Sequence, residues 1–339
     1  MELREIAGQR LPAIGLGFMN LSHAYGTPPD EAQAVRVLHK ALAFGVRHFD
    51  TAALYGFGRN EALLGKTLGR RRKDVFLASK CGMTGVDGRR VIDGRPETLL
   101  RTLDEGLKRL QTDHIDLYYL HRWDRNVPIE DSIGAMARMV DAGKVGALGL
   151  SEVSAATLRR AHAVHPIAAV QSEFSLWTRN PEIAVLDACR ELGAAFVAFS
   201  PLARGFLADP RLDPGEFPDG DIRHGMPRFQ SPHFGRNRRL LDAFAELAAS
   251  AGCTTAQLAL AWVLDGGDHV LTIPGTTSVD HLEENLRTTE LQIDGAVLER
   301  AATLINEETV SGPRYSQVTQ REIDTEEFAD LAERRETGA

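Results

Sequence analysis

Short apolar runs rich in β-branched residues alternate with helical patterns along the chain, and this alternation constrains the fold more than any other feature. Each run has the length and composition of a parallel strand that is buried on both faces. The runs lie at residues 14–16, 46–49, 75–78, 115–120, 145–150, 167–170, 195–199 and 270–273. Eight parallel strands with intervening helices are the number that closes an α/β barrel. The sequence therefore predicts one α/β domain over residues 1–339 with the (β/α)8, or TIM barrel, fold.

Local signals outside the predicted strands support this architecture. Residues 3–6 and 10–13 flank Ala7-Gly8-Gln9, and we expect them to form an N-terminal β-hairpin that seals the bottom of the barrel. Thr254 and Gln257 have the spacing of a capping box, which indicates a helix start. The predicted helices can therefore pack one apolar stripe against the strands.

Two segments do not fit the repeating pattern. Residues 203–236 are rich in Gly, Pro, Asp and Arg and lack clear periodicity, and we expect them to form an irregular loop over the cofactor. The chain beyond about residue 310 is polar and charged, and the sequence does not decide whether this tail covers the active site.

Composition excludes several classes of partner. The formal net charge of -8 and the lack of a Lys/Arg stripe argue against a nucleic-acid partner. No run of about 18 apolar residues predicts a membrane span, and residues 1–9 do not resemble a signal peptide. Cys81, Cys189 and Cys253 are far apart, which fits a reducing cytoplasm rather than a disulfide framework. The number of subunits is not predicted.

Polar residues follow three consecutive predicted strands. Asp50 ends the second strand and Tyr55 lies in the loop after it, while Lys80 ends the third strand and His121 the fourth. Active sites of such barrels lie at the C-terminal ends of the strands, so these four side chains are expected to converge. Convergent titratable groups of this kind are typical of a catalytic site.

The four side chains suit the reduction of a carbonyl group. Hydride delivered to carbon leaves negative charge on oxygen, which then needs a proton donor. Tyr55 is the predicted general acid, with Lys80 stabilising its phenolate and Asp50 holding Lys80 in place. His121 is expected to donate a hydrogen bond to the carbonyl oxygen and orient it.

Here the chain resembles the aldo-keto reductases, from Leu11-Pro12-Ala13-Ile14-Gly15-Leu16-Gly17 through to Ile273-Pro274-Gly275. Further matching motifs are Gly143-Lys144-Val145, Leu148-Gly149-Leu150-Ser151, Gln171 and Ser200-Pro201-Leu202-Ala203-Arg204-Gly205. The family's catalytic Asp, Tyr, Lys and His fall on Asp50, Tyr55, Lys80 and His121. The resemblance is strongest to a bacterial and yeast branch that includes pyridoxal reductases, which makes pyridoxal-type aldehydes a candidate substrate.

The resemblance implies a bound NADPH, with NADH as the alternative. Ser151 and Gln171 would hold its carboxamide, and Phe199 would lie under the nicotinamide. The remaining expected contacts border the ring, track the pyrophosphate or reach the adenosine end: Gly17, Met19, Asp50, Ser200, Leu202, Arg204, Gly205, Gly275, Thr276, Thr277, Ser278, His281, Glu284 and Asn285.

Two departures from the family pattern concern this cofactor. Glu152 follows Ser151 where many relatives have Asn, so the second carboxamide contact is open. Many relatives place Lys or Arg against the 2′-phosphate, whereas this chain offers hydroxyls and backbone amides at residues 275–278 and His281.

Aromatic and thioether side chains in loops after the strands are expected to wall an apolar substrate pocket. They are Tyr25, Phe57, Met83, Trp123 and Trp177.

The sequence fits other chemistries less well. No complete G-x-G-x-x-G motif follows a strand, which argues against a classical dinucleotide-binding fold. No His-x-His pair suggests a metal site, so no metal is expected. Two alternatives stay open: a Schiff-base lyase or aldolase that uses Lys80 as nucleophile, and a cofactor-binding regulatory subunit with little turnover.

Overall fold

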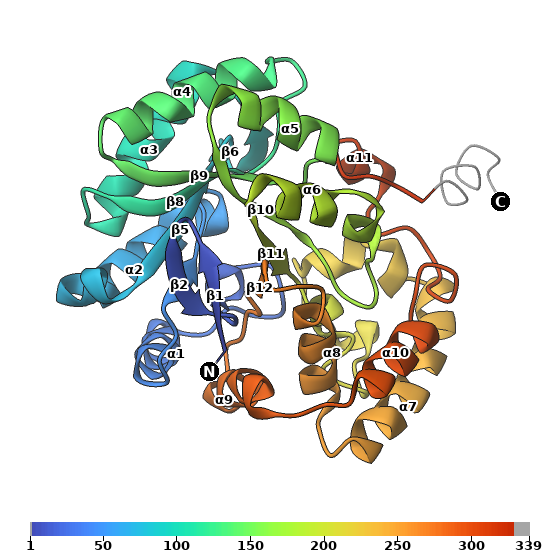
Figure 1. The fold of residues 1–339 in the computed structure, drawn as a ribbon. Coiled ribbons are helices and arrows are strands. Elements are labelled where there is room, and N and C mark those ends of the chain that lie inside the picture. Colours follow the sequence, from blue (N-terminus) through green and yellow to red (C-terminus); the bar gives the residue numbers. More distant parts are fainter. Residues whose placement is uncertain (1, 329–339) are drawn as a thin grey trace.

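The structure is a computed structural model that describes residues 2–328, and its centre is a barrel of eight parallel strands surrounded by helices (Figure 1). In hydrogen-bonded order the strands are β3 (Leu16–Gly17), β4 (His48–Asp50), β5 (Phe76–Cys81), β8 (Ile115–Leu120), β9 (Val145–Ser151), β10 (Ile167–Glu173), β11 (Ala195–Phe199) and β12 (Val270–Thr272). Parallel bridges from Ile14 to Thr272 and from Gly17 to Gly275 join the first strand to the last, so the barrel is nearly closed. The predicted TIM barrel is confirmed, and each predicted run overlaps one strand.

Eight helices form a ring around the strands, because each can bury one apolar stripe against the sheet. They are α1 (Glu31–Ala43), α2 (Arg59–Leu68), α3 (Pro96–Leu110), α4 (Ile129–Asp141), α5 (Ala155–Val164), α6 (Val185–Leu192), α8 (Thr255–Leu264) and α9 (Val279–Arg287). The predicted capping box is present at the start of α8, where Thr254 and Gln257 bond each other's backbone amides. Helices α7 (His233–Ser250) and α10 (Gly295–Leu304) pack on each other and on α8, outside this ring.

Short helical turns occupy many of the connections. They are η1 (Met19–Leu21), η2 (Tyr55–Gly58), η3 (Gly69–Asp74), η4 (Asn180–Ile183), η5 (Ala203–Gly205), η6 (Pro214–Glu216), η7 (Ile222–Gly225), η8 (Pro227–Phe229), η9 (Thr288–Glu290) and the four-residue helix α11 (Gln317–Gln320). The irregular segment after β11 therefore consists of four such turns. It ends at residue 232, slightly earlier than the 236 expected from the sequence, because α7 begins at His233.

The predicted N-terminal hairpin is present as β1 (Leu3–Ile6) and β2 (Gln9–Pro12). Ala7 and Gly8 both have positive φ, as a two-residue hairpin turn requires. Ile6 and Leu11 belong to the apolar cluster inside the barrel, so the hairpin closes its bottom as expected.

A second hairpin, β6 (Met83–Val86) and β7 (Arg89–Ile92), was not predicted. Its Asp87-Gly88 turn is a common hairpin signal. The flanking strands are largely exposed and lack an alternating apolar pattern, which explains why the sequence did not reveal them.

The barrel interior determines which residues reach the active face. Its apolar cluster comprises Ile6, Leu11, Phe76, Ala78, Leu117, Tyr119, Ala169, Ala195, Val197, Leu271 and Ile273. Side chains alternate between the two faces of a strand, so on β5 the series from Phe76 and Ala78 continues to Lys80. On β8 the same alternation carries from Tyr119 to His121. The polar site is therefore the top layer of the barrel's own interior.

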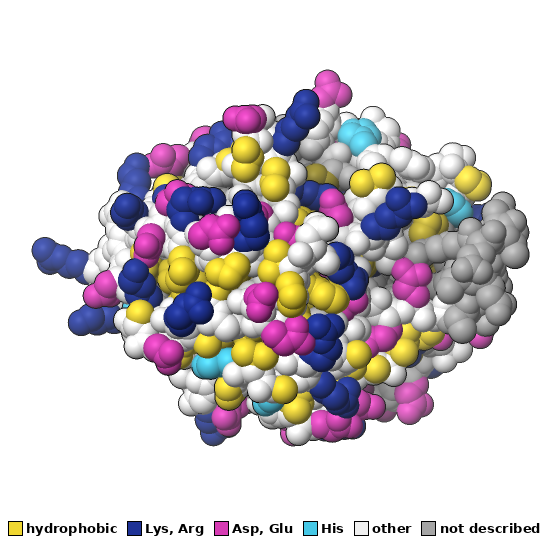
Figure 2. Space-filling model, turned by 90° about the horizontal axis from the view of Figure 1, so that it is seen from above, with side chains coloured by type: hydrophobic (Ala, Val, Ile, Leu, Met, Phe, Trp, Pro, Cys, Tyr) yellow, Lys and Arg dark blue, Asp and Glu magenta, His cyan; other side chains and the backbone are white. Residues whose placement is uncertain are grey.

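The outer surface carries interspersed charges. Figure 2 shows one face on which Lys and Arg mix with Asp and Glu, without a continuous stripe of either sign. Within residues 2–328, no single helix has the length and hydropathy of a membrane span, although the bent pair α7 and α8 together meets those two criteria.

Candidate active site

Asp50, Lys80 and Tyr55 form a buried, hydrogen-bonded group at the top of the barrel. The Nζ atom of Lys80 donates to Oδ1 of Asp50, to the carbonyl of Thr51 at 2.9 Å and to the hydroxyl oxygen of Tyr55 at 3.2 Å. Lys80 is fully buried, and Gln171 donates to the second oxygen of Asp50 at 2.8 Å. The ammonium group is thus held between a carboxylate and a phenol.

His121 completes the group of four predicted side chains. Its ring meets the ring of Tyr55 edge-on, with centroids 5.8 Å apart. Its Nδ1 is buried and has no hydrogen-bond partner among residues 2–328. The imidazole therefore lies beside the Tyr55 ring, and its Nδ1 is available for a further hydrogen bond.

The protonation states follow from burial and from neighbouring charges. Burial raises the pKa of Tyr55 above its usual range and outweighs the opposing effect of Lys80. Burial alone would lower the pKa of Lys80, but Asp50 and Tyr55 overcome it and raise that pKa. Burial, with Lys80 and Arg122 next, lowers the pKa of His121 well below its usual range. At neutral pH the site therefore holds a phenol, an ammonium and a neutral imidazole.

The balance at Tyr55 differs from the sequence argument, which counted only the neighbouring cation. In the structure Asp50 neutralises part of the charge of Lys80, and burial disfavours the phenolate further. Tyr55 is thus a group that keeps its proton until a partner arrives to take it.

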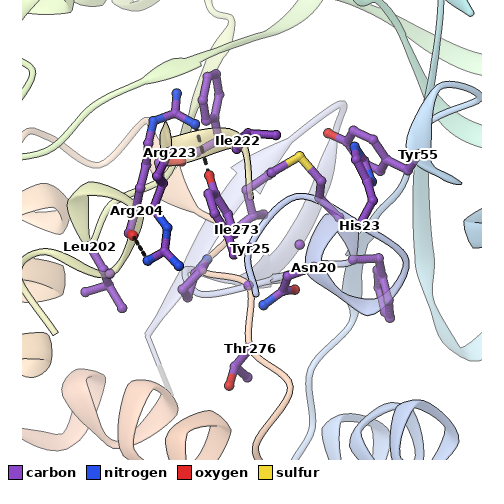
Figure 3. Close-up of a pocket in the computed structure, with 18 of the residues that line it drawn as sticks. Asn20, His23, Tyr25, Tyr55, Leu202, Arg204, Ile222, Arg223, Ile273 and Thr276 are labelled. Atoms are coloured by element: carbon purple, nitrogen blue, oxygen red, sulfur yellow. Dashed lines mark hydrogen bonds between the residues drawn. The ribbon is translucent and has the colours of Figure 1, made fainter. Parts of the chain in front are cut away.

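A cavity of about 1130 Å³ opens above these residues. It extends from His121 at the barrel mouth to Asn285 on α9, and loops from far-apart parts of the chain border it (Figure 3). Asp50, Tyr55 and His121 line it directly. Lys80 does not line the cavity and contacts it through Tyr55 and Asp50, which do.

Most of the predicted cofactor contacts border this cavity. They are Gly17, Met19, Asp50, Ser151, Gln171, Phe199, Ser200, Leu202, Arg204, Gly205, Gly275, Thr276, Thr277, His281, Glu284 and Asn285. Ser278 is the exception, because its hydroxyl caps α9 by accepting from the amide of His281.

The floor of the cavity suits a dinucleotide. A Cβ at Gly275 would approach Oδ1 of Asn20 to 3.0 Å and the carbonyl oxygen of Gly17 to 3.1 Å, so the backbone packs closely here and only glycine fits. Oδ1 of Asn20 is buried without a hydrogen-bond partner among the described residues. Thr276 and Thr277 add hydroxyls close to the N-terminus of α9, where backbone amides favour phosphate. The residues present therefore fit NADPH.

Arg204 lies in a different environment from the one predicted. Its guanidinium pairs with Glu173 and donates to the hydroxyls of Tyr25 and Tyr315, at 2.9 and 2.8 Å. Dashed lines in Figure 3 mark its bond to Tyr25 and the bond that its own carbonyl accepts from Arg223. The expectation that the Arg204 side chain tracks the pyrophosphate stays a prediction, and in this structure Glu173, Tyr25 and Tyr315 hold its guanidinium at the edge of the cavity.

Two of the five predicted substrate-pocket residues lie elsewhere. Tyr25, Phe57 and Met83 line the cavity, but Trp123 and Trp177 do not. Trp177 is buried and stacks on Phe206, with ring centroids 3.9 Å apart. Trp123 donates to the carbonyl of Val127 and packs beneath the guanidinium of Arg125. Both tryptophans are packing residues of their own loops.

The unusual Glu152 takes part in a buried ion network. Its Oε1 accepts from the backbone amide of Glu173, and its Oε2 pairs with Arg314 of the C-terminal tail. Arg314 also pairs with Glu173 at 2.9 Å. Burial would raise the pKa of Glu173, but Arg204 and Arg314 overcome it and lower that pKa to about 2. Glu152 therefore anchors the tail rather than presenting an amide to the cofactor.

The tail also contributes to the cavity, which the sequence left open. Tyr315, Ser316 and Thr319 line it, and Asp324 accepts from the hydroxyl of Ser154 at 3.0 Å. Residues 311–328 therefore lie along the active face. The final part of the predicted tail, residues 329–339, is outside the described residues.

Several cavity residues were missed by sequence reasoning, namely Asn20, His23, Arg59, Arg90, Arg122, Tyr315, Ser316 and Thr319. Arg122 directly follows His121 and so had a positional signal. The tail residues are separated from their neighbours by more than a hundred positions and had none. Within residues 2–328, no group of three or more His, Cys, Asp or Glu is arranged to hold a metal ion.

The sequence matches a family model and curated relatives over most of its length. The model of the aldo/keto reductase family matches residues 13–306. An aldo-keto reductase of Schizosaccharomyces pombe, named yakc [NADP(+)], is 40% identical over 319 residues, covering 92% of this chain and 94% of the relative. A probable aldo-keto reductase of Glycine max is also 40% identical, over 311 residues, covering 91% of this chain and 89% of the relative.

Solved structures share the same fold. The glycerol dehydrogenase of Gluconobacter oxydans matches with a TM-score of 0.82 at 27% identity, covering 92% of this chain and 97% of that one. An aldo-keto reductase of Bacillus halodurans, in its holo form, matches with a TM-score of 0.76 at 26% identity, covering 94% and 99%.

Proposed function

The chain belongs to the aldo/keto reductase family, and on that basis we propose that it reduces aldehydes or ketones to alcohols with NADPH. The observation that carries this proposal is the 3.2 Å contact between the Tyr55 hydroxyl and the Lys80 ammonium, at the edge of a cavity large enough for a dinucleotide and a substrate. The name of the fission-yeast relative includes NADP(+), which supports the choice of cofactor.

The cofactor would lie along the cavity and supply hydride to the carbonyl carbon. Ser151 and Gln171 would hold its carboxamide, and the exposed face of Phe199 would support the ring. Thr276, Thr277 and the amides that begin α9 would take its phosphate at the adenosine end, since anions are favoured there.

Side chains of the protein would then orient and protonate the carbonyl oxygen of the substrate. The neutral imidazole of His121 donates a hydrogen bond to the carbonyl oxygen and fixes its position over the cavity floor. Tyr55 gives its proton to the developing alkoxide, and the ammonium of Lys80 stabilises the phenolate that remains. Asp50 keeps Lys80 charged and in place, so reprotonation of Tyr55 resets the site.

The Schiff-base alternative is not favoured by the position of Lys80. A nucleophilic lysine must be neutral and open to substrate. Lys80 is fully buried, does not line the cavity and makes three hydrogen bonds. Its pKa is raised rather than lowered, after Asp50 and Tyr55 overcome the effect of burial.

Replacement of the proposed proton donor tests this function. We expect Tyr55→Phe to lower kcat for aldehyde reduction by about 10² to 10⁴-fold, because proton donation is lost while the ring remains. Steady-state assays with NADPH and with NADH, on a panel of aldehydes and ketones, measure the change in kcat and the cofactor preference. NADPH affinity, followed by fluorescence, should stay close to the original value.

Unchanged turnover in the Tyr55→Phe protein would contradict the proposed role. Tight NADPH binding by the unmodified protein, with negligible turnover across the whole panel, would instead favour a regulatory cofactor-binding subunit.

A further inference from the structure

Arg122 stands out among the buried arginines. Four arginines between residues 2 and 328 are at most 8% exposed over the whole residue: Arg4, Arg122, Arg223 and Arg314. Three of them pair with carboxylates: Arg4 with Glu2, Arg223 with Asp221, and Arg314 with both Glu152 and Glu173. Arg122 is 8% exposed and has no carboxylate partner among the described residues. A buried cation without a partner is costly, so an anion is expected nearby when the site is in use.

The contacts of Arg122 leave one edge of its guanidinium free. Among the described residues, only Nη1 has partners, namely the carbonyl of His121 at 2.8 Å and the hydroxyl of Ser151 at 3.3 Å. Nε and Nη2 make no hydrogen bond to residues 2–328. These two nitrogens form the fork that binds a carboxylate through two parallel hydrogen bonds.

The position of Arg122 connects this edge with the substrate. Arg122 lines the cavity and immediately follows His121, whose imidazole faces the Tyr55 ring. The pyrophosphate of a dinucleotide is expected along residues 200–205 and its adenosine phosphate near Thr276 and α9, whereas Arg122 contacts His121 and Ser151. An anion held by Arg122 would therefore belong to the substrate rather than to the cofactor.

The surroundings at this end are cationic and aromatic. Arg59 and Arg90 also line it, and Arg90 has Glu322 as a partner. The acidic side chains that line the whole cavity are Asp50, Asp209 and Glu284. Asp50 is neutralised by Lys80, Glu284 is one of the expected cofactor contacts, and Asp209 lies in the loop after η5. Phe57 follows Tyr55 in η2 and supplies an aromatic ring, and Tyr25 and Tyr315 line the same cavity.

We propose that Arg122 is a specificity-determining residue that selects carbonyl substrates bearing a carboxylate, particularly aromatic ones. This inference rests on the proposed reductase function, because it assigns the substrate class of the same site. Arg122 binds the carboxylate through Nε and Nη2, which places the carbonyl group of the same molecule beside His121 and Tyr55.

The test compares aldehydes that carry a carboxylate with their uncharged methyl esters. The 2-, 3- and 4-carboxybenzaldehydes and their methyl esters are reduced by the unmodified protein and by Arg122→Gln. We expect the unmodified protein to prefer at least one acid over its ester. Arg122→Gln should lose that preference by about ten- to hundredfold, mainly through KM, because a charge-assisted bidentate contact is removed. Reduction of the esters, which carry no carboxylate, should fall less than reduction of the acids.

Arg125→Gln is the matched control. Arg125 lies three residues further along the same loop, pairs with Asp324 and does not line the cavity. Its replacement removes the same charge and should leave the acid-to-ester ratio unchanged. An equal loss for acid and ester in Arg122→Gln, or no preference in the unmodified protein, would overturn the inference while leaving the reductase proposal intact.

Calorimetry separates this inference from the proposed function. The product analogue 3-(hydroxymethyl)benzoate is titrated into the protein with and without NADP+, and into Arg122→Gln. Selective loss of binding in the variant supports the carboxylate site even if no aldehyde is reduced, and failure of the unmodified protein to bind the analogue overturns it.

If Arg122→Gln does not fold, Arg122→Lys keeps the charge without the fork and should retain only part of the preference. A fully retained preference would then count against the inference.

Discussion

At the scale of single residues, the site depends on charges that are buried together. Lys80 and Asp50 are both almost completely buried, and each neutralises the other. Charges of this kind stabilise a fold only as a pair, because removal of one partner leaves the other without compensation. The pair therefore links catalysis with the stability of the barrel mouth.

Lys80→Met is expected to lower the free energy of unfolding by about 3–5 kcal/mol, because Asp50 is left as an uncompensated buried charge. The double variant Asp50→Asn, Lys80→Met should recover much of that loss. Urea unfolding of both variants measures the difference. Aldehyde reduction should be lost in both, since the cation beside Tyr55 is missing, and recovery of turnover in the double variant would contradict the role given to Lys80.

The sequence was informative about these residues because their placement is local to each strand. Asp50, Lys80 and His121 sit at strand ends, and the two-residue alternation carries each into the interior. The substrate side was less predictable. Trp123 and Trp177 follow strands as Tyr25 and Met83 do, but loop packing turns their rings away from the cavity.

At the scale of elements, the active face is assembled from segments that contact one another through ion pairs. Glu152 after β9, Glu173 at the end of β10, Arg204 in η5 and Arg314 in the tail form one network. This network ties the loop after β11 and the tail to the barrel.

Arg314→Ala is expected to destabilise the fold by about 3–5 kcal/mol, since Glu152 then lacks its cation. Glu152→Gln should reduce the cost of losing Arg314, and a double-mutant cycle by chemical unfolding measures their coupling. Proteolysis at the tail should also become faster in Arg314→Ala. Strictly additive effects of the two substitutions would show that the pair does not anchor the tail.

Gly17, at the seam that closes the barrel, and Gly134, inside α4, are expected to respond oppositely to the addition of a methyl group. A Cβ at Gly17 would lie 2.8 Å from the carbonyl oxygen of Ile273, so Gly17→Ala should destabilise by about 1–3 kcal/mol through forced displacement of backbone. Gly134 lies inside α4, where such a carbon would have no heavy atom within 4 Å apart from the neighbouring backbone of its own helix. Gly134→Ala should therefore stabilise by about 0.5–1 kcal/mol. Thermal unfolding of both variants tests the pair, and equal shifts in Tm would contradict it.

At the scale of the whole molecule, buried histidines make the fold sensitive to mild acid. Burial lowers the pKa of His48 to about 4. Both of its ring nitrogens are without hydrogen-bond partners among residues 2–328. His23, His121, His233 and His269 also have lowered pKa values, in each case chiefly because of burial.

The direction of the pH effect follows from proton uptake. Between pH 6.5 and about 4 the unfolded chain binds a proton at His48 and the folded chain does not, so stability falls as the pH falls. For His48 alone the loss approaches about 3 kcal/mol by pH 4. Glu173 acts in the same direction, but only between pH 4.5 and about 2. The loss of stability between pH 6.5 and 4.5 therefore comes mainly from the buried histidines.

Urea unfolding at pH 7.5, 6.5, 5.5 and 5.0 measures this loss. His48→Leu, which keeps an apolar side chain against Phe76, should show a shallower decline over the same range. A stability that is constant or rises from pH 6.5 to 5 would exclude the histidine account.

The sequence by itself determined the barrel, its hairpin floor and the four polar residues at its mouth. These features depend on the spacing of apolar residues and on the order of strands and helices, and both can be followed along consecutive residues. Only the tertiary structure decided the partners of Arg204, the anchoring of the tail by Glu152, and the free edge of Arg122. Each of those contacts depends on which loops meet above the barrel. Their free energy is set by burial and by charges that the fold brings together from distant positions in the sequence.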